Sequence, residues 1–97
     1  MKNPPTAIFA ANDLTAAGVY NAVFAKGLNI PKDIAVAGHD DIDLASLLRP
    51  ALTTMSQPKY SIGERAVTVL MKMINSDREL KIDDQILSTN LIIRESV

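Results

Sequence analysis

The stretch Thr6–Asp41, TAIFAANDLTAAGVYNAVFAKGLNIPKDIAVAGHDD, decides the fold of this chain. It begins with a continuous apolar run, Thr6–Ala11, which is typical of a strand buried on both faces. Residues 14–26 predict a helix, because helix-capping residues precede them and Gly27 follows them. A second apolar run, Ile34–Gly38, predicts another buried strand. Strand, helix and strand at this spacing indicate a βαβ unit with parallel strands.

The rest of the chain continues this alternation. Residues 42–51 have mixed polarity and predict a loop with one turn of helix. Leu52–Ser56 is rich in β-branched residues and predicts a third strand. Residues 58–74 place apolar side chains at helical spacing opposite a charged side, which predicts an amphipathic helix lying on a sheet. After a polar turn, two short runs are strand-like, Ile86–Leu87 and Leu91–Ile93. The predicted fold class is α/β.

The composition excludes several classes of protein. With 97 residues, 47% of them apolar and 22% charged, the chain is typical of one folded domain rather than a disordered segment. Ten basic and eleven acidic residues give a net charge of −1, so we expect no basic face that contacts DNA. No apolar run is long enough to cross a membrane. The chain has no cysteine, which fits the reducing cytoplasm.

Polar side chains follow each predicted parallel strand. They are Asn12 and Asp13 after the first, Asp40 and Asp41 after the second, and Ser56 and Gln57 after the third. Ligands of open α/β sheets bind beyond the carboxyl ends of the strands, so these residues predict a pocket for a small polar ligand. Asp13 is equally well interpreted as the helix N-cap. Because consecutive side chains diverge, we expect one of the two neighbouring aspartates to face the crevice and the other to cap the next turn.

The sequence offers no set of catalytic residues. His39 stands without a nearby nucleophile signature, so we interpret it as a packed residue at a strand end. The acidic pair is similar to that of phosphate-receiver domains, but the further acidic residue and lysine that those domains need have no counterpart. The glycines are isolated, which excludes a phosphate-binding loop. We therefore expect no enzyme, no cofactor and no metal site.

Five ordered motifs, which run without obvious gaps from about Pro4 to the end, resemble the ligand-sensing core of the lactose/galactose repressor (LacI/GalR) family of bacterial transcription regulators. They are PTAIFAANDLTAAG (Pro5–Gly18), KGLNIPKDIAVAGHDD (Lys26–Asp41), RPALTTMSQP (Arg49–Pro58), SIGERAVTVL (Ser61–Leu70) and IIRES (Ile92–Ser96). The resemblance implies that residues 1–97 form the C-terminal portion of the effector-binding lobe, part of a doubly wound, mostly parallel sheet with helices on both faces. It implies operator binding only through an N-terminal helix-turn-helix, for which these residues hold no counterpart.

The resemblance also implies which residues bind the effector, a sugar or sugar phosphate. Asn12 and Asp40 match effector-binding positions of the family, and Gln57 matches a position at the edge of the cleft. His39 departs from the tyrosine or phenylalanine that is usual there, which leaves the identity of the effector open. The alternative is a periplasmic sugar-binding protein of the same architecture, which usually lacks the compact RPALTTMSQP connection.

The first predicted helix is apolar nearly all round, which predicts two buried faces. If its small residues Gly18, Ala22 and Ala25 lie on the sheet, an outward stripe forms and marks an interface. In the resembling family this helix and the segment that matches residues 44–52 form dimer contacts. We therefore expect a homodimer whose interface contains Ala17, Tyr20, Phe24, Leu47 and Leu48. Association through an unpaired sheet edge is the alternative.

Overall fold

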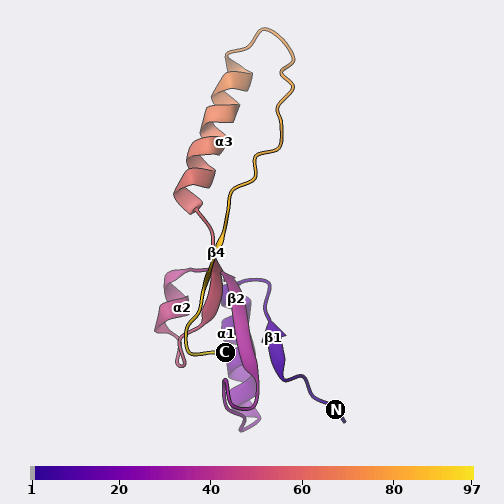
Figure 1. Ribbon diagram of the computed structural model, residues 1–97, viewed down its shortest axis with the longest axis vertical. Helices are drawn as coiled ribbons and strands as arrows, with labels where there is room; N and C mark the ends of the chain where they lie inside the picture. Colours follow the sequence, from indigo (N-terminus) through magenta and orange to yellow (C-terminus); the bar gives the residue numbers. More distant parts are fainter. Residues whose placement is uncertain (1) are drawn as a thin grey trace. The chain divides into compact units, whose positions relative to one another are not determined.

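The computed structural model describes residues 2–97 and consists of two compact units. The sheet unit comprises the chain up to Ser56 together with Asn90–Val97, and the helical unit comprises Gln57–Thr89 (Figure 1). The chain therefore leaves the sheet unit once and returns to it for its last eight residues.

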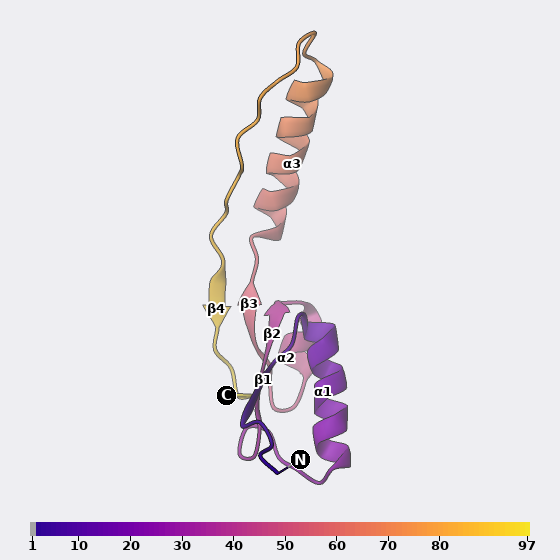
Figure 2. The same ribbon diagram turned by 90° about the vertical axis from the view of Figure 1, so that its right-hand side faces the viewer.

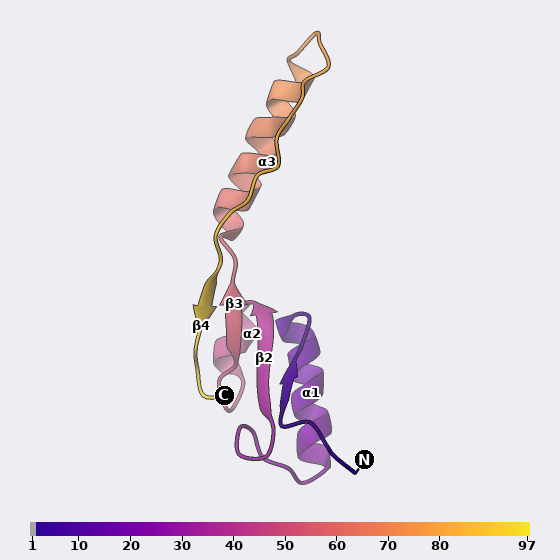
Figure 3. The ribbon, with the colours of Figure 1, turned by 45° about the vertical axis from the view of Figure 1, so that its right-hand side comes forward.

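The sheet unit contains four strands in the order β1-β2-β3-β4, and Figure 3 shows them side by side. They are β1 (Ala7–Phe9), β2 (Ala35–Asp40), β3 (Thr53–Ser56) and β4 (Asn90–Ile92). The first three pair in parallel, and β4 pairs antiparallel with β3. This confirms the predicted α/β class with a mostly parallel sheet. The strand-like run Ile86–Leu87 is neither strand nor helix.

Helix α1 (Asp13–Ala25) forms where the sequence predicts it. Asn12 is its N-cap, because the Asn12 Oδ1 accepts a hydrogen bond from the Thr15 backbone N–H at 2.8 Å. The helix ends before Gly27, whose φ of +71° is a conformation that glycine adopts without strain. The capping residue and the terminating glycine are local signals, so the sequence predicts both without knowledge of the tertiary structure.

The face that α1 buries differs from the predicted one. Ala16, Tyr20 and Val23 are buried against the sheet, whereas the small residues that we expected there, Gly18, Ala22 and Ala25, are exposed. Tyr20 is only 2% exposed, so its place in an outward stripe was wrong. Its ring adds apolar area to the core, and its hydroxyl donates to the Pro50 carbonyl oxygen at 2.9 Å, which satisfies the polar end.

We expect Tyr20→Phe to lower the free energy of unfolding by about 1 kcal/mol at neutral pH, because the Pro50 carbonyl loses its donor. Burial raises the pKa of Tyr20 above its usual value near 10.0, with repulsion from Glu95 adding to this and a hydrogen bond with Ser96 opposing it. The raised pKa stabilises the fold below pH 10, and this contribution is lost as the pH rises through the folded pKa. Urea unfolding between pH 7 and pH 11 measures this effect. The free energy of unfolding should fall more steeply with rising pH for the original chain than for Tyr20→Phe. Parallel pH curves would contradict this.

The helices of the sheet unit pack on one face of the sheet. Val36 and Leu52 are fully buried beneath α1, and the short helix α2 (Asp43–Leu47) adds Ala45 to the same core. In Figure 2, α1 lies to one side of the strands. The alternation of side chains places Phe9, Leu91 and Ile93 on the opposite face, where they are exposed. Within the sheet unit, α1 and α2 therefore share one face of the sheet.

The helical unit contains α3 (Lys59–Ile74) and the return segment 75–89. The predicted helix is confirmed, but no residue of α3 is buried. Apolar side chains along it are exposed, among them Tyr60, Val67, Leu70 and Ile74. The packing of this apolar side on a sheet stays a prediction, because α3 and the sheet belong to different units.

Candidate functional site

The carboxyl ends of the parallel strands bring the predicted ligand residues of the sheet unit to one edge. Phe9 of β1 pairs with Ala37, and Asp40 at the end of β2 pairs with Ser56 at the end of β3. Asn12 follows β1 three residues after Phe9 and begins α1. Asn12 and Asp40 therefore lie at the same edge of the sheet, as the pattern of strand ends predicted.

The side chain of Asn12 caps the helix. Its side-chain oxygen is engaged by the Thr15 N–H, which leaves the side-chain NH₂ to donate. The N-cap is thus Asn12 and not Asp13, which corrects one of the two interpretations offered for Asp13. The other interpretation, a ligand contact, was also wrong, because Asp13 is 0% exposed.

The buried carboxylate of Asp13 connects α1 with β3 and with the start of α2. Its Oδ1 accepts from the Thr54 hydroxyl at 2.6 Å, and its Oδ2 accepts from the Ile42 backbone N–H at 2.9 Å. The approach is permitted by Gly38, because a Cβ there would collide with Asp13 Oδ1. A buried carboxylate is tolerated when its oxygens are hydrogen-bonded in this way.

Asp40 and Asp41 diverge as expected, but for a reason that the sequence did not show. Both have left-handed backbone conformations, with φ of 112° and 52°. Asp41 Oδ1 accepts from the Arg94 guanidinium at 2.8 Å instead of capping the next turn. Asp40 Oδ1 lies 3.1 Å from His39 Nδ1, and the Asp40 side chain is 38% exposed. Asp40 is therefore the more exposed acid of the pair, since the Asp41 side chain is 23% exposed.

Sequence reasoning missed Arg94 and Thr54, which hydrogen-bond Asp41 and Asp13 at this edge. Arg94 also donates to the Leu52 carbonyl oxygen at 2.9 Å, so it connects the segment after β4 with the residue before β3. The IIRES motif contained Arg94, but a motif does not reveal which distant carboxylate an arginine meets. Thr54 stood within a run of β-branched strand residues, where its hydroxyl gave no signal of its own.

Gln57 is the first residue of the helical unit and is half-buried. Its carbonyl oxygen accepts from the Lys59 backbone N–H at 2.8 Å, just before the Ile62 N–H makes the first helical hydrogen bond of α3 to the Pro58 carbonyl oxygen. Its role as a ligand residue stays a prediction.

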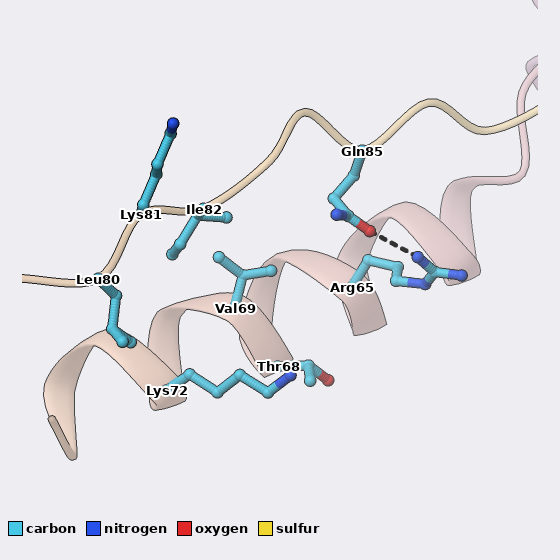
Figure 4. Close-up of a pocket in the computed structure, with 8 residues that line it drawn as sticks. All are labelled: Arg65, Thr68, Val69, Lys72, Leu80, Lys81, Ile82 and Gln85. Atoms are coloured by element: carbon cyan, nitrogen blue, oxygen red, sulfur yellow. Dashed lines mark hydrogen bonds between the residues drawn. The ribbon is translucent and has the colours of Figure 1, made fainter.

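The helical unit has a hollow of its own, of about 450 Å³, between α3 and the return segment. Figure 4 shows Arg65 turned toward Gln85, to which its guanidinium donates at 2.6 Å, and Lys81 directed away from the hollow. Val69, Leu80 and Ile82 contribute apolar side chains. None of the predicted ligand residues lines this hollow, so it is not the predicted site.

The predicted interface residues fall into three groups by their exposure. Phe24 is 45% exposed and Leu47 is 69% exposed, so both are available for contact. Ala17 is half-buried, and Leu48 packs partly against the core. Tyr20 meets Phe24 edge to face at a centroid distance of 5.8 Å, so it supports the exposed ring from within the core.

No helix between residues 2 and 97 is both long enough and apolar enough to cross a membrane.

Comparisons with known proteins point to one family. A family model described as a periplasmic binding protein-like domain matches residues 1–97. The chain is 51% identical over 70 residues to the ribose operon repressor of Escherichia coli K12, covering 72% of this chain and 21% of that protein. It is 40% identical over 93 residues to the ribose operon repressor of Haemophilus influenzae, covering 96% and 28%. The chain thus spans less than a third of the length of these relatives.

A solved structure agrees with these matches. The chain superposes with a TM-score of 0.88 on a LacI family transcriptional regulator from Enterococcus faecalis V583, crystallised with bound ribose. The identity is 35%, and the match covers 98% of this chain and 35% of that one.

Proposed function

We propose that this chain forms the effector-sensing part of a bacterial transcription repressor. It belongs to the periplasmic binding protein-like domain family, and its relatives with this domain are LacI/GalR regulators. In this proposal, residues 1–97 are the C-terminal portion of the effector-binding lobe. The observation that carries it is the half-exposed carboxylate of Asp40 at the same sheet edge as the Asn12 amide.

The chemistry of this edge suits a polyhydroxylated ligand. The Asp40 carboxylate accepts hydrogen bonds from hydroxyl groups, and the Asn12 NH₂ donates to hydroxyl or ring oxygens. We propose a sugar or sugar phosphate as the effector, and the ribose bound in the Enterococcus faecalis regulator supports the sugar class. The resemblance to the LacI/GalR family makes Gln57 a third proposed ligand residue.

The proposed regulator acts on operator DNA through a domain outside these residues. The net charge of −1 supports this, since few phosphates could be neutralised by the chain itself. Such a regulator works in the cytoplasm. The relatives of this chain are named as repressors, which favours a transcription regulator over a periplasmic sugar-binding protein and over an enzyme.

A chimera tests the proposal. Residues 1–97 replace the matching segment of the Haemophilus influenzae ribose operon repressor, with which they share 40% identity. We expect calorimetry to detect saturable binding of D-ribose or of another pentose or hexose from a small panel. A folded chimera that binds none of these sugars would contradict the proposal.

The proposed homodimer uses the exposed surface of α1 and α2. We retain Ala17, Phe24, Leu47 and Leu48 and remove Tyr20, which is buried. Small exposed residues make the outer face of α1 flat, and they are Gly18, Ala22 and Ala25. A flat helix face supports the close approach of a second copy of the chain.

We expect Phe24→Lys combined with Leu47→Lys to weaken dimerisation of the 97-residue chain by tenfold or more, about 1.4 kcal/mol, because two exposed apolar contacts become charged. Ile86→Lys is the matched control, since Ile86 is 92% exposed but lies in the helical unit. Sedimentation velocity measures both variants. If the double variant stays as dimeric as the control, the contact runs through a sheet edge instead.

A further inference from the structure

Two consecutive residues at the proposed site have backbone conformations that side chains disfavour. Asp40 has φ of 112° and Asp41 has φ of 52°, and neither is glycine. Such conformations are disfavoured for residues that carry a side chain, and they persist only where the surroundings hold them. The contacts that hold this kink therefore decide where the Asp40 carboxylate points.

Side chains from two other elements hold the backbone of the kink. The Thr54 hydroxyl accepts from the Asp41 backbone N–H at 3.4 Å and donates to Asp13 Oδ1 at 2.6 Å. The second Asp13 oxygen accepts from the Ile42 backbone N–H at 2.9 Å. Asp13 and Thr54 are both 0% exposed, so water cannot replace these bonds.

We propose that Asp13 and Thr54 are positioning residues of the effector site, which hold the left-handed kink and thereby aim the Asp40 carboxylate at the ligand. This inference rests on the proposed function. Neither residue touches the ligand. They act on it through the backbone of residues 40–42, and we call these two side chains and their bonds the kink clamp.

The chemistry of the clamp explains why a carboxylate and a hydroxyl stand in the core. An ionised carboxylate only accepts, so it takes both the Thr54 hydroxyl and the Ile42 N–H. A hydroxyl can donate and accept at the same time. The Thr54 hydroxyl therefore donates to Asp13 and accepts from the Asp41 backbone N–H, which connects the two residues. Arg94 engages the Asp41 carboxylate at 2.8 Å, which keeps the second acid of the pair away from the ligand position.

The first experiment examines the clamp without any ligand. Thr54→Val keeps the shape of the side chain and removes the hydroxyl, and Thr54→Ser restores it. Thr53→Val is the matched control, because Thr53 is also buried on β3 but its hydroxyl accepts from the Arg94 N–H instead. In the 97-residue chain, we expect Thr54→Val to speed amide hydrogen exchange at Asp41 and Ile42 about tenfold or more over the control. HN–Hα couplings should report the loss of a single left-handed conformation.

The second experiment measures D-ribose affinity in the chimera described above. We expect Thr54→Val to raise the Kd about tenfold or more, Thr54→Ser to restore it, and Thr53→Val to leave it within about twofold. Unchanged exchange at Asp41 and Ile42, or an unchanged Kd despite a mobile kink, would overturn the positioning role. If the original chimera binds no sugar, the proposed function fails, and the exchange experiment alone then decides whether the clamp holds the kink.

Discussion

We expect Gly38→Ala to lower the free energy of unfolding of the chain by about 3 kcal/mol. A Cβ at this position would collide with Asp13 Oδ1 and would lie 3.0 Å from Leu52 Cδ2. Neither neighbour can give way cheaply. Asp13 is held by hydrogen bonds from Thr54 and Ile42, and Leu52 is fully buried. The added methyl group therefore breaks a buried hydrogen bond or forces the core apart.

Gly18→Ala is the matched control for this prediction. Gly18 lies on the exposed side of α1, where nothing stands within 4 Å of an added Cβ. In a helix interior, alanine is more favourable than glycine by about 0.5–1 kcal/mol, so this variant should be more stable than the original chain. Urea unfolding followed by circular dichroism compares the variants. Equal stability of Gly38→Ala and the original chain would mean that Asp13 is held less firmly than its contacts indicate.

Asp40→Ala should reduce the affinity of the chimera for its sugar effector by about 1.5–3 kcal/mol, which is about 10- to 150-fold in Kd. The variant removes the charged acceptor from the edge of the sheet, and the ligand hydroxyl groups that it bound lose their partner on entering the site. Calorimetric titration with D-ribose measures the change directly.

Asp43→Ala controls for the loss of a negative charge near the site, because Asp43 is an exposed residue in the first turn of α2. We expect its Kd to stay within about threefold of the original. Thermal unfolding of both variants separates a lost ligand contact from a lost fold. An Asp40→Ala variant that is folded and binds D-ribose with unchanged affinity would remove Asp40 from the site.

The order of strands and helices was predictable because its signals are local. The apolar runs before Asn12 and before His39 became β1 and β2, and the helix between them ends before Gly27 as predicted. The polar residues after these strands identified the sheet edge for the same reason, since the carboxyl ends of parallel strands meet there. The resemblance to the LacI/GalR family likewise depended on contiguous motifs.

The amino-acid sequence by itself determined the three parallel strands, the helices α1 and α3, and the edge at which Asp40 stands. Only the tertiary structure decided which face of α1 is buried, because a helix that is apolar nearly all round defines no stripe of its own, and the Pro50 carbonyl that satisfies Tyr20 lies 30 residues away. The same holds for the roles of Asp13 and Asp41. Their partners Ile42 and Arg94 lie 29 and 53 residues along the chain, and hydrogen bonds over such separations leave no periodic pattern in a sequence.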